Sequence, residues 1–154
     1  MKNIDIIAFR SEFAQDFARL NIEWLEKYFV VEPHDAELME RCEETIIGPG
    51  GHIFFARVDN SLVGTVALIP MEEKIFELGK MAVSEAFQGM RIGQKLMQYC
   101  IDFGREKGWK KLILYSNTVL ENAIYIYRKY GFVEIPQEAN PPYARSNIKM
   151  AYLL

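Results

Sequence analysis

The feature that most constrains the fold is a strand–helix–strand unit near the middle of the chain. The sequence predicts strands at Ile75–Val83 and Lys111–Tyr115, and the segment between them, Arg91–Lys107, carries apolar residues at helical spacing. Two strands joined through a helix cannot form a tight hairpin, and the crossover makes them run parallel. We therefore expect a sheet with at least one parallel strand pair and a helix packed on it.

The part of the chain before residue 75 predicts two helices and an antiparallel front to this sheet. The expected elements are a strand at Ile4–Phe9, a helix capped by Ser11, a helical stretch from Pro33 to about Ile47 that a break could interrupt, and hairpin strands at His52–Arg57 and Leu62–Ile69. Pro70 is expected to stop the second hairpin strand, because proline has no N–H to donate to a ladder.

The last part of the chain predicts one more helix and a closing strand pair. The helix spans Leu120–Tyr130 and ends at Gly131, a favoured C-terminal residue. Phe132–Ile135 and Ser146–Leu153 are the expected closing strands. The predicted class is mixed α+β, with one sheet of about six to seven strands and helices on both of its faces.

Length and charge fit a single domain covering residues 1–154 and exclude some classes of function. The chain has a formal net charge of −3 and no basic run, which argues against a nucleic-acid groove. No stretch approaches the roughly 20 apolar residues of a membrane helix, and the start lacks a signal-peptide core. We therefore expect a cytoplasmic protein with no membrane or nucleic-acid partner. Cys42 and Cys100 are expected to be reduced thiols, and neither they nor the histidines show metal-ligand spacing.

The loop before the central helix has the composition of an anion site. Its sequence is Gln88-Gly89-Met90-Arg91-Ile92-Gly93. A helix start presents free backbone N–H groups and the positive end of the helix dipole, and glycine lets a phosphate approach closely. Alone, this pattern is equally compatible with an ordinary loop and helix entry.

Four segments together resemble the GCN5-related N-acetyltransferase (GNAT) superfamily. Its pyrophosphate loop is written Q/R-x-x-G-x-G/A, and this chain has Gln88-x-x-Arg91-x-Gly93, with Arg91 in place of the usual middle glycine. The other segments are Glu77–Val83 before the loop, Leu112–Tyr115 followed by Asn117, and Ala123-x-x-x-Tyr127-x-Lys129-x-Gly131-Phe132. The four occur in the family's order, and the flanking helices and strands also fit its layout.

The resemblance implies acetyl-CoA as co-substrate, no metal, and a parallel strand pair that splays apart to admit the pantetheine arm. Unpaired N–H and C=O groups in such a gap can satisfy an amide-rich chain. The residues that the resemblance assigns to the cofactor are Met81, Ala82, Val83, Gln88, Gly89, Met90, Arg91, Ile92, Gly93, Asn117 and Asn122. Asn117 and Asn122 could instead cap the helix near Leu120.

The resemblance also assigns two candidate catalytic residues. Family tyrosines at the position of Tyr127 lie near the CoA sulfur, where a proton donor assists the leaving thiolate. Glu77 stands on the strand where some members carry a glutamate base, and an amine must lose a proton before it attacks. Each residue has a plainer interpretation, helix packing for Tyr127 and a solvated strand face for Glu77.

The acceptor is the least constrained part of the function. In the family the first two helices and the last hairpin frame it, which makes Trp24, Tyr28, Glu32, Tyr143 and Arg145 candidate wall residues. Aromatic rings with a carboxylate suit an ammonium group, and Arg145 could pair with a substrate carboxylate. An amino acid, a short peptide or a small polyamine-like amine would each satisfy this pattern, and Trp24 also lies on the apolar helix stripe expected in the core.

The sequence predicts an N-acetyltransferase that works by direct transfer in a ternary complex, because neither cysteine is placed to carry the acetyl group. Two alternatives stay open: a non-catalytic acyl-CoA-binding or regulatory module, and an acyltransferase that uses a longer acyl-CoA. The protein could form a homodimer. A generic nucleotide-binding domain is disfavoured because the sequence contains neither G-x-x-x-x-G-K-[ST] nor G-x-G-x-x-G.

Overall fold

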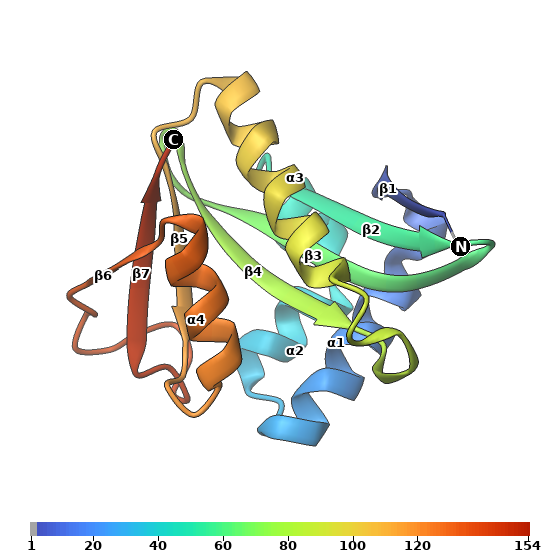
Figure 1. The fold of residues 1–154 in the computed structure, drawn as a ribbon, viewed down its shortest axis with the longest axis horizontal. Helices are drawn as coiled ribbons and strands as arrows, with labels where there is room; N and C mark the ends of the chain where they lie inside the picture. Colours follow the sequence, from blue (N-terminus) through green and yellow to red (C-terminus); the bar gives the residue numbers. More distant parts are fainter. Residues whose placement is uncertain (1–2) are drawn as a thin grey trace.

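The computed structural model describes residues 3–154, which form one seven-stranded sheet with helices on both faces (Figure 1). The strands are β1 (Ile4–Ala8), β2 (His52–Val58), β3 (Ser61–Glu72), β4 (Ile75–Val83), β5 (Lys111–Ser116), β6 (Val133–Ile135) and β7 (Ile148–Leu153). The α-helices are α1 (Ala14–Tyr28), α2 (Pro33–Glu40), α3 (Ile92–Lys107) and α4 (Glu121–Tyr130). The mixed α+β prediction is confirmed.

The sheet has the order β1-β2-β3-β4-β5-β7-β6. Strands β1 to β4 pair antiparallel in sequence order, and β4 and β5 form the predicted parallel pair joined through α3. The last strand, β7, inserts between β5 and β6 and runs antiparallel to both. The parallel pair is therefore in the interior of the sheet, with antiparallel strands on either side (Figure 1).

Two local predictions were wrong. Ser11 does not cap the first helix: it starts a short 3₁₀ turn, Ser11–Phe13, and α1 follows without a side-chain cap. Pro70 does not stop its strand, because β3 continues to Glu72 past an irregularity in its pairing with β4, and such irregularities tolerate proline. The break that the sequence left open in the helical stretch from Pro33 is present, because a separate π-helical turn, Glu43–Ile47, follows α2.

Two apolar clusters bind the helices to opposite faces of the sheet. On one face, Leu96 and Cys100 of α3 pack with strand residues such as Leu78, and α4 packs against the same cluster. On the other face, Phe17 and Leu20 of α1 pack with Leu38 of α2. The central strand β4 is thus covered on both sides, and its side chains alternate between two different helix layers.

A bulge in β4 interrupts that alternation at Lys80. Two residues of β4, Lys80 and Met81, oppose the single residue Val66 of β3, and Lys80 has the left-handed φ of 51°. Strict alternation would place Lys80 on the face of Leu78, which packs in the α3 cluster. The bulge instead brings the Lys80 ammonium to the α2 side, where it pairs with Asp35.

The Lys80–Asp35 ion pair is buried between β4 and the first turn of α2. The Lys80 side chain is 3% exposed and that of Asp35 0%. Burial alone would raise the pKa of Asp35, but hydrogen bonds from Arg145 and Lys80 outweigh it and lower that pKa to about 2. Asp35 also accepts the Glu32 backbone N–H at 2.9 Å, so the same carboxylate caps α2. The pair therefore fixes the position of α2 against the bulged strand.

Lys80→Met should lower the free energy of unfolding by about 3 kcal/mol, because the buried Asp35 carboxylate loses one of its two cationic partners. Chemical denaturation would measure the change. The matched control is Lys27→Met, which removes the largely exposed Lys27–Glu85 pair and should change the free energy of unfolding far less, because water already screens these charges. Equal losses in the two variants would contradict the structural role of the buried pair.

Candidate active site

The two parallel strands separate after a short paired stretch. β4 and β5 pair only from Ile75 with Lys111 to Glu77 with Ile113, although β4 continues to Val83 and β5 to Ser116. A cavity of about 720 Å³ is lined by the unpaired ends of both strands. That volume is in the range of small-molecule sites, and the strand ends bring unpaired backbone groups to its wall.

The predicted anion loop closes one end of this cavity. Gly89 has a φ of 86° and Arg91 a φ of 59°, so the chain makes two left-handed residues before α3 starts at Ile92. A non-glycine residue in this conformation costs about 1–2 kcal/mol, and Arg91 therefore permits the bend at some cost. The first N–H groups of α3 have no partner inside the helix, which leaves donors available at the cavity.

Most of the residues assigned to the cofactor line this cavity. These are Met81, Ala82, Val83, Gln88, Gly89, Arg91, Ile92, Gly93, Asn117 and Asn122. Met90 is exposed and is not among the lining residues. Asn117 is partly engaged already, since it donates to the Arg145 carbonyl at 2.7 Å and accepts the Val119 N–H at 2.8 Å.

Tyr127 lines the cavity from α4. Its ring packs edge-on against Phe132 with centroids 6.0 Å apart, and its backbone carbonyl accepts the Phe132 N–H. Burial raises the pKa of the Tyr127 hydroxyl, which keeps it protonated at neutral pH. A protonated hydroxyl in a cavity wall can act as a proton donor.

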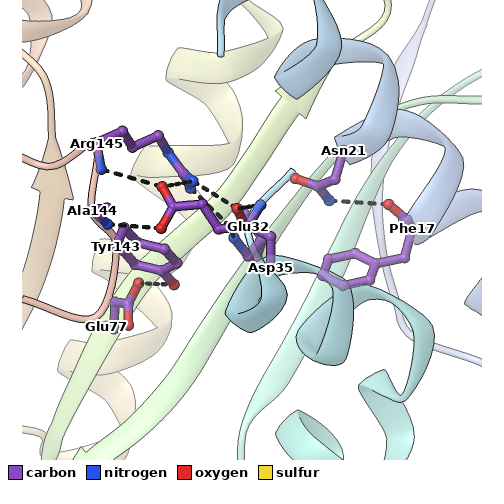
Figure 2. Close-up of polar contacts among 9 residues, drawn as sticks. Phe17, Asn21, Glu32, Asp35, Glu77, Tyr143, Ala144 and Arg145 are labelled. Atoms are coloured by element: carbon purple, nitrogen blue, oxygen red, sulfur yellow. Dashed lines mark hydrogen bonds and ion pairs between the residues drawn. The ribbon is translucent and has the colours of Figure 1, made fainter. Parts of the chain in front are cut away.

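Glu77 is buried in the same cavity wall and is held by Tyr143. The Tyr143 hydroxyl donates to Glu77 Oε2 at 2.8 Å, as Figure 2 shows. Burial raises the pKa of the Glu77 carboxyl, while the Tyr143 hydrogen bond and the charges of Lys80 and Arg145 act in the lowering direction. The solvated strand face that offered a plainer interpretation does not exist here, because Glu77 is only 6% exposed. A carboxyl with a raised pKa in a cavity is suited to accept a proton.

Arg145 and Glu32 are bound mainly to other residues of the chain. Arg145 donates to Asp35 Oδ2 at 2.7 Å and Oδ1 at 2.9 Å, and to Glu32 Oε2 at 3.2 Å (Figure 2). Glu32 also accepts the Ala144 N–H at 2.7 Å and the Arg145 N–H at 3.2 Å. Arg145 lines the cavity, but Glu32 does not. The sequence-based expectation of an Arg145 free for a substrate carboxylate does not match this geometry.

Aromatic side chains at the end of α1 and just after it form another part of the cavity wall. The Trp24 ring lies 5.2 Å from that of Tyr28 and 5.8 Å from that of Phe29, and all three line the cavity. Trp24 is partly buried and also packs on the α1–α2 core, so both of its expected placements apply.

Two polar residues of the site could not be identified from the sequence. Asp35 follows a proline at a helix start, a position that only indicates a cap. Lys80 is an ordinary strand residue in the sequence, and nothing there marks the bulge that turns it inward. Their ion pair joins residues 45 positions apart, which a pattern of local spacing cannot predict.

Both cysteines lie in the apolar core of the protein. Cys100 and Cys42 are both buried free thiols, and burial raises the pKa of each. Within residues 3–154 no group of three or more His, Cys, Asp or Glu residues is arranged to hold a metal ion. In the same part of the chain, none of the helices is both long enough and apolar enough to cross a membrane.

Known proteins share both the sequence pattern and the fold. The chain is 32% identical over 88 residues to a probable N-acetyltransferase camello of Xenopus tropicalis, a match that covers 56% of this chain and 40% of the relative. An acetyltransferase of the GNAT family from Staphylococcus aureus superposes with a TM-score of 0.87 at 22% identity, covering 98% of this chain and 99% of that one. A GNAT family acetyltransferase from Elizabethkingia anophelis, solved with acetyl-CoA bound, superposes with a TM-score of 0.68 at 21% identity over 99% of both chains.

The match to the camello protein spans less than half of that relative's length. The two solved structures are too distant in sequence to show more than the fold. The family model for the acetyltransferase (GNAT) family, by contrast, matches residues 17–132, which include all four motifs. The chain belongs to the GNAT family of acetyltransferases.

Proposed function

We propose that this protein is an N-acetyltransferase of one domain that moves the acetyl group of acetyl-CoA directly to an amine. The observation that carries the proposal is a single cavity that joins the gap between β4 and β5, the start of α3, Tyr127 and Glu77. These parts supply a place for an extended amide chain, an anion site, a proton donor and a proton acceptor. The acetyl-CoA found in the Elizabethkingia relative supports this choice of co-substrate.

The pantetheine arm would lie in the gap between the strands and the pyrophosphate at the start of α3. Gly93 supports this placement, because a Cβ there would meet only Met81 Sδ at 3.6 Å and Val83 at 4.0 Å, both ordinary contacts. The fold itself therefore does not require glycine at this helical position, although glycine costs about 1 kcal/mol there relative to alanine. Close approach of a phosphate to the backbone would account for it.

The proposed reaction removes two protons from the acceptor nitrogen. Glu77 takes the first from the acceptor ammonium, and the resulting amine nitrogen attacks the thioester carbonyl to form a C–N bond. The tetrahedral intermediate collapses as the C–S bond breaks, and Tyr127 donates its proton to the departing CoA thiolate. The second proton of the nitrogen then passes to the Tyr127 oxygen, and Glu77 releases its proton to solvent, which leaves a neutral amide, a free CoA thiol and both side chains in their starting states. The acetyl group passes directly between the two substrates, which is consistent with the burial of both cysteines.

The direct test is release of free thiol from acetyl-CoA in the presence of a panel of amines. Turnover that depends on the amine is expected. If acetyl-CoA bound but no amine supported thiol release, the protein would be a non-catalytic acyl-CoA-binding module. Parallel assays with longer acyl-CoA compounds would reveal a different acyl preference.

Arg91→Gly should separate the backbone cost of Arg91 from its charge. Glycine relieves the left-handed φ and should raise the free energy of unfolding by about 0.5–1 kcal/mol, while loss of the cation weakens acetyl-CoA binding several-fold at low salt. The matched control Arg91→Gln should lose the same affinity without the gain in stability. Unchanged affinity and salt dependence in both variants would remove Arg91 from the phosphate site.

Tyr127→Phe should lower kcat by about 100-fold or more, the usual effect of removing a general acid, and leave the Kd for acetyl-CoA within a few-fold. Tyr125→Phe is the matched control, because Tyr125 lies on the same helix but is 65% exposed, and it should behave as wild type. Unaltered turnover in Tyr127→Phe would leave the ring with a packing role only.

Glu77→Gln should lower kcat/KM by about 100-fold or more and remove one inflection from its pH profile. In the wild type kcat/KM should rise with pH through the raised pKa of Glu77, since only the ionised carboxylate accepts a proton. Tyr143→Phe should move that inflection to higher pH, because the lost hydrogen bond stabilised the ionised form. A pH profile that is the same in wild type and Glu77→Gln would exclude Glu77 as the base.

A further inference from the structure

Around the acceptor end of the cavity, two cations are paired with two anions, and one further acid has no cationic partner of its own. Lys80 and Arg145 are the two cations, and Asp35 and Glu32 are the two anions that bind them. Glu77 is the remaining acid, and it accepts a hydrogen bond from the neutral Tyr143 hydroxyl. When Glu77 is ionised, this group carries one negative charge that no side chain in it neutralises.

The two cations are not available to a ligand at low cost. Asp35 holds Arg145 through both of its oxygens, and the Lys80 side chain is almost fully buried against the same carboxylate. Glu32 cannot easily give up Arg145, because backbone N–H groups of Ala144 and Arg145 hold its two oxygens in place. A substrate carboxylate would have to compete with these fixed partners, or stay buried without a cation.

Arg91 is the other cation among the described residues that line the cavity, and it belongs to the loop before α3, at the proposed pyrophosphate site. Lys27 lies near Tyr28 with its ammonium 5.3 Å from the ring centroid, but it is paired with Glu85 at 2.8 Å. No unpaired cation therefore marks the acceptor end within the part of the chain that the structure describes.

The rest of the acceptor wall is aromatic and partly open to solvent. Trp24 contacts both Tyr28 and Phe29 there, and Tyr28 remains 41% exposed. The next residue after Phe29, Val30, is 71% exposed. Covering such a wall with an apolar group lowers the free energy, and the faces of its rings also attract an ammonium.

We propose, on the basis of the proposed function, that the acceptor is a small primary amine on an aromatic or otherwise apolar body, with no carboxylate beside the amine. Its ammonium would supply the missing counter-charge to Glu77, and its apolar body would lie on Trp24 and Tyr28. This narrows the acceptor class and disfavours free amino acids.

The test compares three acceptors that share one ring: 2-phenylethylamine, phenylalanine amide and phenylalanine. The pH-independent kcat/KM should be highest for 2-phenylethylamine and at least tenfold lower for phenylalanine. Phenylalanine amide, whose carboxamide group is uncharged, should lie between them. Ethanolamine, which lacks the ring, should also be at least tenfold poorer than 2-phenylethylamine. Phenylalanine or ethanolamine used as well as 2-phenylethylamine would overturn the proposal.

Glu32→Gln provides a change of specificity that general damage cannot imitate. It removes one of the two anions on Arg145, while its single amide oxygen can still accept one of the two backbone N–H groups, that of Ala144. The ratio of kcat/KM for phenylalanine to that for 2-phenylethylamine should rise several-fold. An unchanged ratio in a folded variant would mean that Arg145 does not exclude the carboxylate.

Equilibrium binding of the same compounds to the CoA-loaded protein separates this proposal from the proposed function. If thiol release fails with every amine but binding keeps the predicted order, acetyl transfer is wrong and the ligand class stands. If an amine is acetylated but 2-phenylethylamine neither binds nor reacts, the acceptor class is wrong and acetyl transfer stands.

Discussion

The ion pair between Lys80 and Asp35 connects the bulge of β4 to α2 and, through Arg145, to the segment before β7. Without the bulge, Lys80 would face the α3 cluster, and Asp35 would be a buried carboxylate with Arg145 alone. With it, one carboxylate binds two cations and also caps α2. Because Arg145 belongs to the segment before β7, its ion pair with Asp35 ties the end of the chain to α2.

The bulge also lies at the point where β4 leaves β5. The last parallel pair is Glu77 with Ile113, and Lys80 follows three residues later. Two residues that oppose a single residue of the neighbouring strand bend their own strand and increase its twist. This gives a physical reason for β4 to follow β3 while separating from β5. The cavity and the buried ion cluster are thus two consequences of the same local geometry.

The sequence predicted the two ends of this arrangement unequally well. The strand–helix–strand unit from Ile75 to Tyr115 follows local patterns, since helix starts and strand ends each have a signature within a few residues. The residues expected to line the gap came from the resemblance of four short motifs to the GNAT superfamily, and those motifs are also local in the sequence. Even there, Met90 is exposed and does not line the cavity, because neighbouring residues of a loop cannot all point in one direction.

The acceptor half was harder to predict because its polar groups neutralise one another across long sequence separations. In the sequence, Arg145 could serve as a partner for a substrate carboxylate. Its ion pairs with Asp35 and Glu32, more than 100 positions away in the sequence, show that its guanidinium is already bound. The consequence is chemical as well as structural. In the proposed function, the backbone-lined gap would recognise features common to every acyl-CoA, whereas specificity for the acceptor would depend on which charge in the buried set lacks a partner. In this chain that charge is Glu77, so the group that would accept the proton is also the group that would select a cationic substrate.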